Sequence, residues 1–268
     1  MMVPSVEEDL IYDVGLHKGE DSEFYLQKGF RVVAIEALAS HAKSAAHRLR
    51  TYVDSGKIVI LNVAIAEKDG PLTFFESLDS SFWGTTNLER EKSGERCGQK
   101  FVQRTVDGVN FSNILAKYGV PYFLKIDVEG EDTLCLKALR DFAARPKYLS
   151  YESEAKSTRD LREELALLRD LGYKRFKVVR QDAVCSQQCP FPAREGRYVD
   201  QHFEESSSGL FGEEAPGEWI DEHRVIQTYR RIRLHNYLIR ILSRLHLRRS
   251  LRWLVPDPGW HDIHAKRE

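Results

Sequence analysis

Strand and helix patterns alternate along most of the first 180 residues of this chain. Short apolar runs typical of buried strands lie at residues 10–14, 31–36, 57–63, 101–106, 122–127, 147–151 and 173–179. Segments with helical spacing separate most of them, which predicts an α/β fold with a mainly parallel seven-stranded sheet and helices on both faces. Right-handed crossovers then place the carboxyl ends of the parallel strands at one edge, where such sheets bind ligands.

The pattern divides the chain into three parts. Residues 1–184 carry the strand and helix alternation and form the predicted Rossmann-like domain. Residues 185–222 are rich in Pro, Ser and Gly, and we expect a loop region that packs on the domain and shapes a substrate site. Residues 223–268 predict a basic, amphipathic helical extension, which either packs on the domain, forms a homodimer contact or lies on an anionic membrane surface.

Charge and cysteine content exclude several classes of protein. The formal net charge is −1, so the chain lacks the overall basic character that would favour a nucleic-acid partner. We find no apolar run of bilayer length and no signal-peptide pattern, and the four cysteines are too few for a disulfide framework. We therefore expect a cytoplasmic protein. Cys185, Cys189 and His202 have poor spacing for zinc, and ordinary loop thiols are favoured.

The first candidate site follows the first strand. Asp13, Gly15 and Gly19 surround the strand-to-helix turn, and Glu36 ends the next strand. Glycine lets the backbone approach a ligand closely, and an acidic side chain about 20 residues further on can accept hydrogen bonds from ribose hydroxyls. This layout predicts an adenosine site, although an ordinary turn with an incidental glutamate remains the alternative.

The spacing differs from the dinucleotide fingerprint Gly-x-Gly-x-x-Gly. The third glycine is missing, and His17 and Lys18 occupy the turn. A pyrophosphate needs a tight glycine turn, whereas S-adenosylmethionine has no phosphate. The pattern favours S-adenosylmethionine over NAD, and an NAD-linked oxidoreductase or a non-catalytic nucleotide-binding module remain as alternatives.

A second candidate site lies at the end of the strand at residues 122–127. Lys125, Asp127 and Glu129 crowd this strand end and its turn, and the same sheet edge carries Gly15 and Glu36. A buried charge needs a partner, so Lys125 and one acid form either a structural ion pair or part of a ligand site in which Asp127 faces the ligand.

These motifs, taken in order, resemble the FkbM-type methyltransferase family. The most specific string is Lys125-Ile126-Asp127-Val128-Glu129-Gly130, and the resemblance covers residues 10–155. Its other elements are Tyr12-Asp13-Val14-Gly15, Val33-Ala34-Ile35-Glu36, Asn62-Val63-Ala64-Ile65-Ala66, Arg104-Thr105-Val106-Asp107 and Tyr151-Glu152.

The resemblance implies a class I methyltransferase fold, an S-adenosylmethionine site and, most often, O-methylation of a sugar, glycan or secondary metabolite. It implies that the amino-acid tail of the cofactor lies against Asp13, Gly15 and Gly19, that Glu36 holds the ribose, that Ala64 lies against the adenine and that Asp127 lies near the methyl group. His17 departs from the family, which often has Asn there. Both side chains can donate a hydrogen bond, so His17 stays among the expected cofactor-binding residues.

A hydroxyl acceptor needs a base. The catalytic candidates at this edge are His17, Asp127, Glu129 and Glu152, with Glu154 nearby. Histidine has the most suitable ordinary pKa, but His17 also lies in the cofactor turn, where it can simply orient the ligand. Asp127, Glu129 and Glu152 offer oxygen ligands for Mg²⁺, but we expect no metal because carboxylates are common at strand edges.

Overall fold

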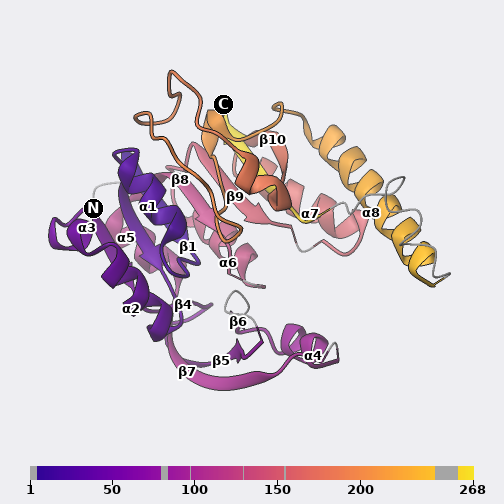
Figure 1. The fold of residues 1–268 in the computed structure, drawn as a ribbon, viewed down its shortest axis with the longest axis horizontal. Coiled ribbons are helices and arrows are strands. Elements are labelled where there is room, and N and C mark those ends of the chain that lie inside the picture. The colour runs from indigo at the N-terminus through magenta and orange to yellow at the C-terminus, as the bar shows by residue number, and fades with distance from the viewer. Residues whose placement is uncertain (1–4, 80–83, 97, 129, 154, 245–258) are drawn as a thin grey trace.

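The computed structural model describes residues 5–79, 84–96, 98–128, 130–153, 155–244 and 259–268. Its main sheet contains β1 (Val6–Val14), β2 (Arg31–Ile35), β3 (Ile58–Leu61), β8 (Val120–Ile126), β9 (Tyr148–Glu152), β10 (Tyr173–Arg180) and β11 (His261–Arg267). The order across the sheet is β10-β11-β9-β8-β1-β2-β3, and every pairing is parallel except those of β11 (Figure 1). The predicted seven-stranded, mainly parallel sheet is confirmed.

Burial on both faces explains why the central strands are apolar. Every residue of β8 is buried, and only Lys125 among them is charged. Side chains alternate between the faces of a strand, so Leu124 and Ile126 belong to one core cluster and Phe123 to the other.

Helices cover one face of the sheet completely. These are α5 (Phe111–Tyr118), α6 (Asp132–Ala138), α7 (Thr158–Asp170) and the first half of α8 (Glu222–Arg244). Helix α7 begins at a capping box in which the Ser157 and Asp160 side chains each accept a backbone N–H, as its sequence favours.

The other face is covered in two different ways. Three helices lie on one half of it: α1 (Glu20–Gln27), α2 (Ala39–Arg48) and α3 (Arg50–Asp54). Helices α2 and α3 follow one another directly and are separated only at Leu49. The segment 185–219 covers the other half mainly as irregular chain. Its Phe211 stacks on Phe123 of β8 with ring centroids 4.8 Å apart, so this segment contributes to the core.

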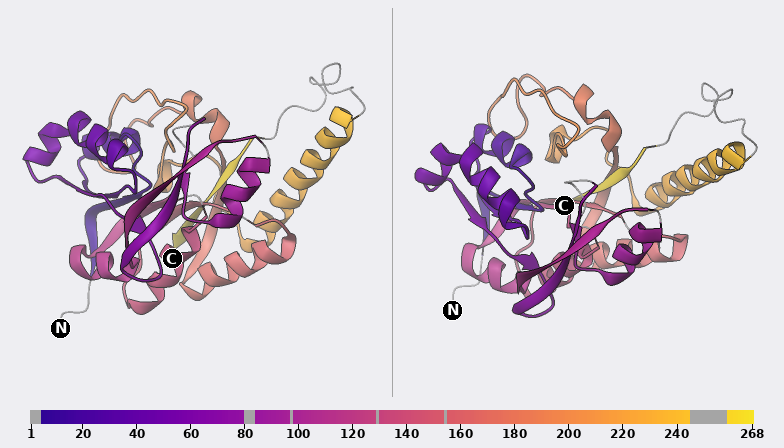
Figure 2. Two further views of the ribbon diagram at one scale, coloured as in Figure 1. Left: turned by 90° about the horizontal axis from the view of Figure 1, so that it is seen from below. Right: turned by 60° about the horizontal axis from the view of Figure 1, so that its bottom comes forward.

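A second, smaller sheet lies beside the main one (Figure 2). Its strands have the order β4-β7-β5-β6 across the sheet. Along the chain, the elements of this region are β4 (Ala64–Ile65), β5 (Gly70–Ser77), β6 (Gly84–Thr85), the helix α4 (Leu88–Arg96) and β7 (Phe101–Val109). The strand predicted at residues 101–106 therefore exists but belongs to this sheet. It pairs antiparallel with β5 in this sheet.

The seventh strand of the main sheet comes from the end of the sequence. We predicted a helical extension over residues 223–268, but α8 ends at Arg244 and residues 261–267 form β11. The prediction is wrong for β11 because its apolar pattern is minimal: only Ile263 and Ala265 contribute to the core. The strand is held in the sheet by antiparallel pairing with β9 on one side and β10 on the other. Among the described residues, no helix is long and apolar enough to cross a membrane.

Candidate functional site

The turn after β1 is packed directly against the end of β8. Gly15 has φ +94°, and a Cβ at this position would lie 2.0 Å from the carbonyl oxygen of Asp127. No side chain fits there, because the obstacle is backbone. Gly15 therefore allows the β1 turn and the β8 turn to meet at the carboxyl edge of the sheet.

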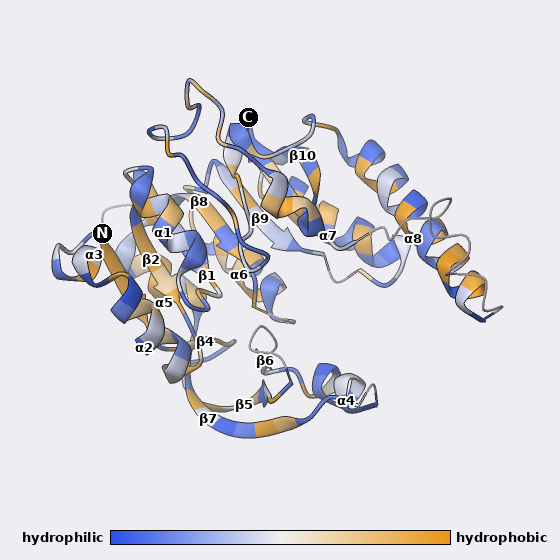
Figure 3. Ribbon diagram, viewed as in Figure 1, coloured by the Kyte–Doolittle hydropathy of each residue, from blue (hydrophilic) through white to orange (hydrophobic). Residues whose placement is uncertain are grey.

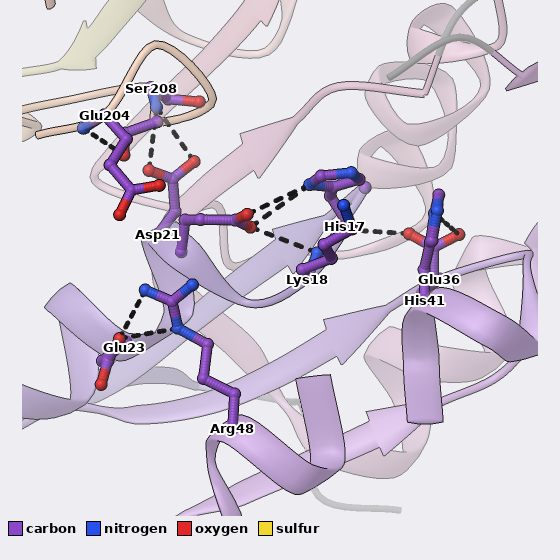
Figure 4. Close-up of polar contacts among 12 residues, drawn as sticks. His17, Lys18, Asp21, Glu23, Glu36, His41, Arg48, Glu204 and Ser208 are labelled. Atoms are coloured by element: carbon purple, nitrogen blue, oxygen red, sulfur yellow. Dashed lines mark hydrogen bonds and ion pairs between the residues drawn. The ribbon is translucent and has the colours of Figure 1, made fainter. Parts of the chain in front are cut away.

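The same turn is tied to β2 through Glu36. The His17 backbone N–H donates to Glu36 Oε2 at 2.8 Å (Figure 4). The Leu38 N–H donates to Oε1 at 2.8 Å. His17 itself has φ +52°, and its Nδ1 lies 3.3 Å from Glu20 Oε2. Gly19, with φ +90°, precedes the first residue of α1.

Burial raises the pKa of Glu36 above its ordinary value, although both backbone N–H groups stabilise the charged form. Each Glu36 oxygen accepts one backbone hydrogen bond, and a carboxylate oxygen has a second lone pair for another donor. The carboxylate is thus held in a fixed orientation at the edge where a ribose diol is expected. Asn62 supports this loop by donating to the carbonyl oxygens of Glu36 and Ala37.

Lys125 is the centre of a buried ionic cluster. Its Nζ lies 3.0 Å from Asp13 Oδ1, 3.3 Å from Asp21 Oδ2 and 3.7 Å from Asp127 Oδ2. Burial alone would lower the pKa of Lys125, but Asp13 and Asp21 outweigh this effect and raise it well above its ordinary value. Three carboxylates surround one lysine, so the edge carries an excess of negative charge. Such surroundings favour a cationic ligand and disfavour a pyrophosphate.

The members of this cluster differ in their access to solvent. Asp13 is completely buried and also accepts a hydrogen bond from the Ser22 hydroxyl at 2.7 Å, so its carboxylate faces protein on several sides. The Asp127 side chain is 51% exposed. Lys125 and Asp13 form the structural ion pair that one interpretation of Lys125 predicts, and the placement of Asp127 against the ligand stays a prediction.

Asp21 connects this cluster to the 185–219 segment. The Ser208 backbone N–H donates to Asp21 at 2.8 Å to Oδ1 and 3.1 Å to Oδ2 (Figure 4). Burial raises the pKa of Asp21 to about 6, against the attraction of Lys125. We did not single out Asp21 from the sequence. Asp21 lies in the polar run from Glu20 to Glu23, so no local signal distinguishes it from its neighbours.

A row of carboxylates continues along the edge beyond Asp127. Ile126, the last residue of β8, pairs with Tyr151 of β9. The residues that follow them are Asp127 and Glu152, and Glu152 in turn pairs with Asp262 of β11. Gln181 Nε2 donates to Asp262 Oδ2 at 2.8 Å. Burial, reinforced by Asp127 and Glu152, raises the pKa of Asp262 well above its ordinary value. The sequence did not identify Asp262 as a site residue, because β11 was not predicted.

Ala64, the residue expected against the adenine, lies close to a hollow in the structure. Ala64 is buried at the start of β4, directly after β3, where the chain enters the small sheet. A hollow of about 590 Å³ opens next to it between the small sheet and α6; its lining includes Ile65, Thr86, Glu131 and Leu134. Glu129 and Glu154 lie outside the described residues.

Metal ligands are not grouped at this edge in the part of the chain that the structure describes. No three His, Cys, Asp or Glu side chains among those residues are arranged to hold an ion. Cys185 is exposed and Cys189 half-buried, and both are free thiols.

Comparison with known proteins gives a clear family match. The model of the methyltransferase FkbM domain matches residues 13–175. A search of the curated proteins found no match. Among solved structures, methyltransferase FkbM from Methylobacillus flagellatus is 18% identical with a TM-score of 0.42, and the match covers 64% of this chain and 40% of that chain. This chain thus corresponds to less than half of that protein's length.

A second solved structure, an S-adenosylmethionine-dependent O-methyltransferase from Thermotoga maritima, is 14% identical with a TM-score of 0.33, covering 65% of this chain and 48% of that one. The family match rests on the domain, which includes Asp13, Gly15, Glu36 and the Lys125–Asp127 strand end and extends over more than half of the 268 residues. The resemblance seen in the sequence is thereby confirmed. The chain belongs to the FkbM family of S-adenosylmethionine-dependent methyltransferases.

Proposed function

We propose that this methyltransferase methylates a hydroxyl group of a sugar, a glycan or a secondary metabolite. The observation that carries the proposal is the row formed by Asp127, Glu152 and Asp262 at the open edge of the sheet. A hydroxyl oxygen is a weak nucleophile until a base removes its proton, and carboxylates in this position can take it. The edge therefore offers the group that O-methylation requires.

The cofactor half of the edge fits S-adenosylmethionine, which supplies an electrophilic methyl group when bound. Glu36 would accept hydrogen bonds from the ribose hydroxyls, and the turn from Gly15 through His17 to Gly19 would lie along the amino-acid tail. Ala64 would lie against the adenine. The negative cluster of Asp13, Asp21 and Asp127 around Lys125 suits the positive charges of a sulfonium and an ammonium group.

Among the base candidates, Asp262 has the strongest support. Its carboxyl group is oriented by Gln181, and its raised pKa makes the ionised form a stronger proton acceptor than an ordinary aspartate. Bound S-adenosylmethionine would transfer its methyl group to the hydroxyl oxygen and leave as S-adenosylhomocysteine, with the electron pair of the broken carbon–sulfur bond on sulfur. The hydroxyl proton passes to the carboxylate. His17 has the alternative task of orienting the cofactor turn, since its backbone binds Glu36.

The neighbourhood of Asp262 also suits a carbohydrate. Trp260 lies two residues before Asp262, immediately before β11, and is 52% exposed. An exposed indole offers an apolar face with a polar N–H, which suits the C–H face of a sugar ring beside its hydroxyl groups.

The test of this proposal is to incubate the protein with methyl-labelled S-adenosylmethionine and a panel of mono- and oligosaccharides and phenolic metabolites. Mass spectrometry then locates the label. We expect the label on oxygen, and transfer only to nitrogen, carbon or sulfur would contradict the proposal.

A further inference from the structure

The second half of α8 carries an apolar stripe on its outer side. Leu234, Tyr237 and Leu238 are 60%, 61% and 44% exposed, and Ile241 is half-buried. Their spacing, i, i+3, i+4 and i+7, places them on one face of the helix. We call these four residues the α8 stripe. Exposed apolar residues that cluster in this way mark an interaction surface more often than residues that are exposed singly.

The stripe is distinct from the face by which α8 packs on the protein. Val225, Ile226 and Tyr229 in the first half of the helix belong to the main core cluster. Arg233 donates to the Ala155 carbonyl oxygen at 2.9 Å and so faces the α7 side. The helix then continues outward, and Figures 1 and 2 both show its C-terminal end projecting from the body. The stripe is therefore additional to what the fold needs.

Positive charge surrounds the stripe. Helix α8 contains six arginines and a single acidic residue, Glu222, although the whole chain has a net charge of −1. Five of the arginines, Arg224, Arg230, Arg231, Arg240 and Arg244, are exposed. Polar and apolar residues alternate along the helix in Figure 3. Such a combination is typical of helices that lie in the plane of a membrane surface.

We infer that α8 docks the protein onto an anionic phospholipid surface. In this arrangement, the leucines and Ile241 enter the headgroup boundary, Tyr237 stays with its hydroxyl at the polar level, and the arginines reach lipid phosphates. A second copy of the chain is the less suitable occupant of this face, because it would bring two strongly basic helices together. The inference goes beyond the proposed function and does not depend on which group is methylated.

The test is co-sedimentation of the full chain with vesicles of phosphatidylcholine alone and of phosphatidylcholine mixed with phosphatidylglycerol. We expect binding to the anionic vesicles to be about tenfold or more stronger than to the neutral ones, and to weaken as salt is added. Two variants, Leu234→Gln/Leu238→Gln and Arg230→Gln/Arg231→Gln, should each lose about tenfold or more.

Matched controls separate a local effect from a general one. Arg50→Gln/Arg159→Gln is the control for the arginine variant, because it removes the same charge at two exposed residues outside α8. Phe191→Gln is the control for the leucine variant, because it removes an exposed apolar side chain outside α8. Both should bind like the wild type, and circular dichroism should show all variants folded.

Three outcomes would overturn the inference. The first is that the wild type fails to bind anionic vesicles. The second is that the α8 variants bind as well as the controls. The third is that light scattering shows a dimer that Leu234→Gln/Leu238→Gln dissociates, which would assign the stripe to a second copy. Binding of S-adenosylhomocysteine by the same samples shows independently whether the cofactor site is intact.

Discussion

The Asp127 carbonyl oxygen lies 2.0 Å from the point that a Cβ on Gly15 would occupy, so the β1 turn and the end of β8 meet backbone to backbone. This contact joins the two halves of the candidate site. Gly15 belongs to the turn that contains His17 and binds Glu36, and Asp127 is the first residue of the carboxylate row. Any side chain at residue 15 would force the two turns apart.

Gly15→Ala should therefore destabilise the protein by about 3 kcal/mol or more, since it adds a backbone clash to an unfavourable φ. Gly29→Ala is the matched control: Gly29 has a similar φ of +100°, but nothing lies within 4 Å of its added Cβ. Its cost should be limited to backbone strain, about 1–2 kcal/mol. Urea unfolding measures both, and equal costs would show that the Asp127 contact is unimportant.

Lys125→Met should be strongly destabilising because it leaves Asp13 and Asp21 buried without their cation. Removing one partner of a buried ion pair costs roughly 3–5 kcal/mol. Adding Asp13→Asn to this variant should recover part of the loss, since it removes one of the uncompensated charges. Denaturant titration of the single and double variants tests this, and a double variant less stable than Lys125→Met would argue against the ionic cluster.

The raised pKa of Asp21 predicts a specific dependence of stability on pH. The folded-state value of about 6 lies above the unfolded value of about 3.9, so the fold favours the protonated form. The stability that Asp21 contributes is complete below the unfolded pKa and is lost as the pH rises through 6. Relative to Asp21→Asn, the wild type should lose roughly 2–3 kcal/mol between pH 4 and pH 7. A difference that does not change with pH would contradict the assignment.

Asp262→Asn should slow methyl transfer by about 10²- to 10⁴-fold while leaving S-adenosylhomocysteine binding unchanged, because the base acts on the acceptor only. Deprotonated Asp262 is the active form, so the acid limb of the wild-type pH–rate profile should lie above the range of an ordinary aspartate, in keeping with its raised pKa. That limb should vanish in Asp262→Asn. The variants Glu152→Gln and His17→Asn test the other two candidate bases. If one of these variants loses the acid limb of the pH–rate profile and Asp262→Asn keeps it, the base is that other residue and the assignment to Asp262 is wrong.

The central strands and the cofactor edge were predictable from sequence because their signals are local. Strands β1, β2 and β8 each contain a short apolar run, and Gly15 and Glu36 directly follow β1 and β2. Strand β11 was not predictable in the same way. Only Ile263 and Ala265 are apolar and buried among its first five residues, and it becomes a strand because β9 and β10 leave room between them.

The rest of the site depended on that strand and on contacts between distant segments. Asp262 joins the carboxylate row only through β11, and Asp21 meets Ser208 across 187 residues of sequence. Lys125 was recognised as a buried charge, but its three partners come from β1, α1 and its own strand end. Composition and spacing carry no information about such pairings.

The most direct measurement is calorimetric titration of the protein with S-adenosylhomocysteine and, separately, with NAD, using the wild type and Glu36→Gln. We expect S-adenosylhomocysteine to bind and NAD not to bind. Glu36→Gln should weaken the binding of S-adenosylhomocysteine by about tenfold or more, roughly 1.4 kcal/mol, because a carboxylate bonded to the ribose is lost. Glu8→Gln is the matched control and should bind like the wild type, because Glu8 is exposed in the first half of β1, at the opposite end of that strand from Gly15. Binding of NAD in place of S-adenosylhomocysteine, or equal affinity of Glu36→Gln and the wild type, would contradict the assignment of the cofactor site to the edge formed by Gly15, His17 and Glu36.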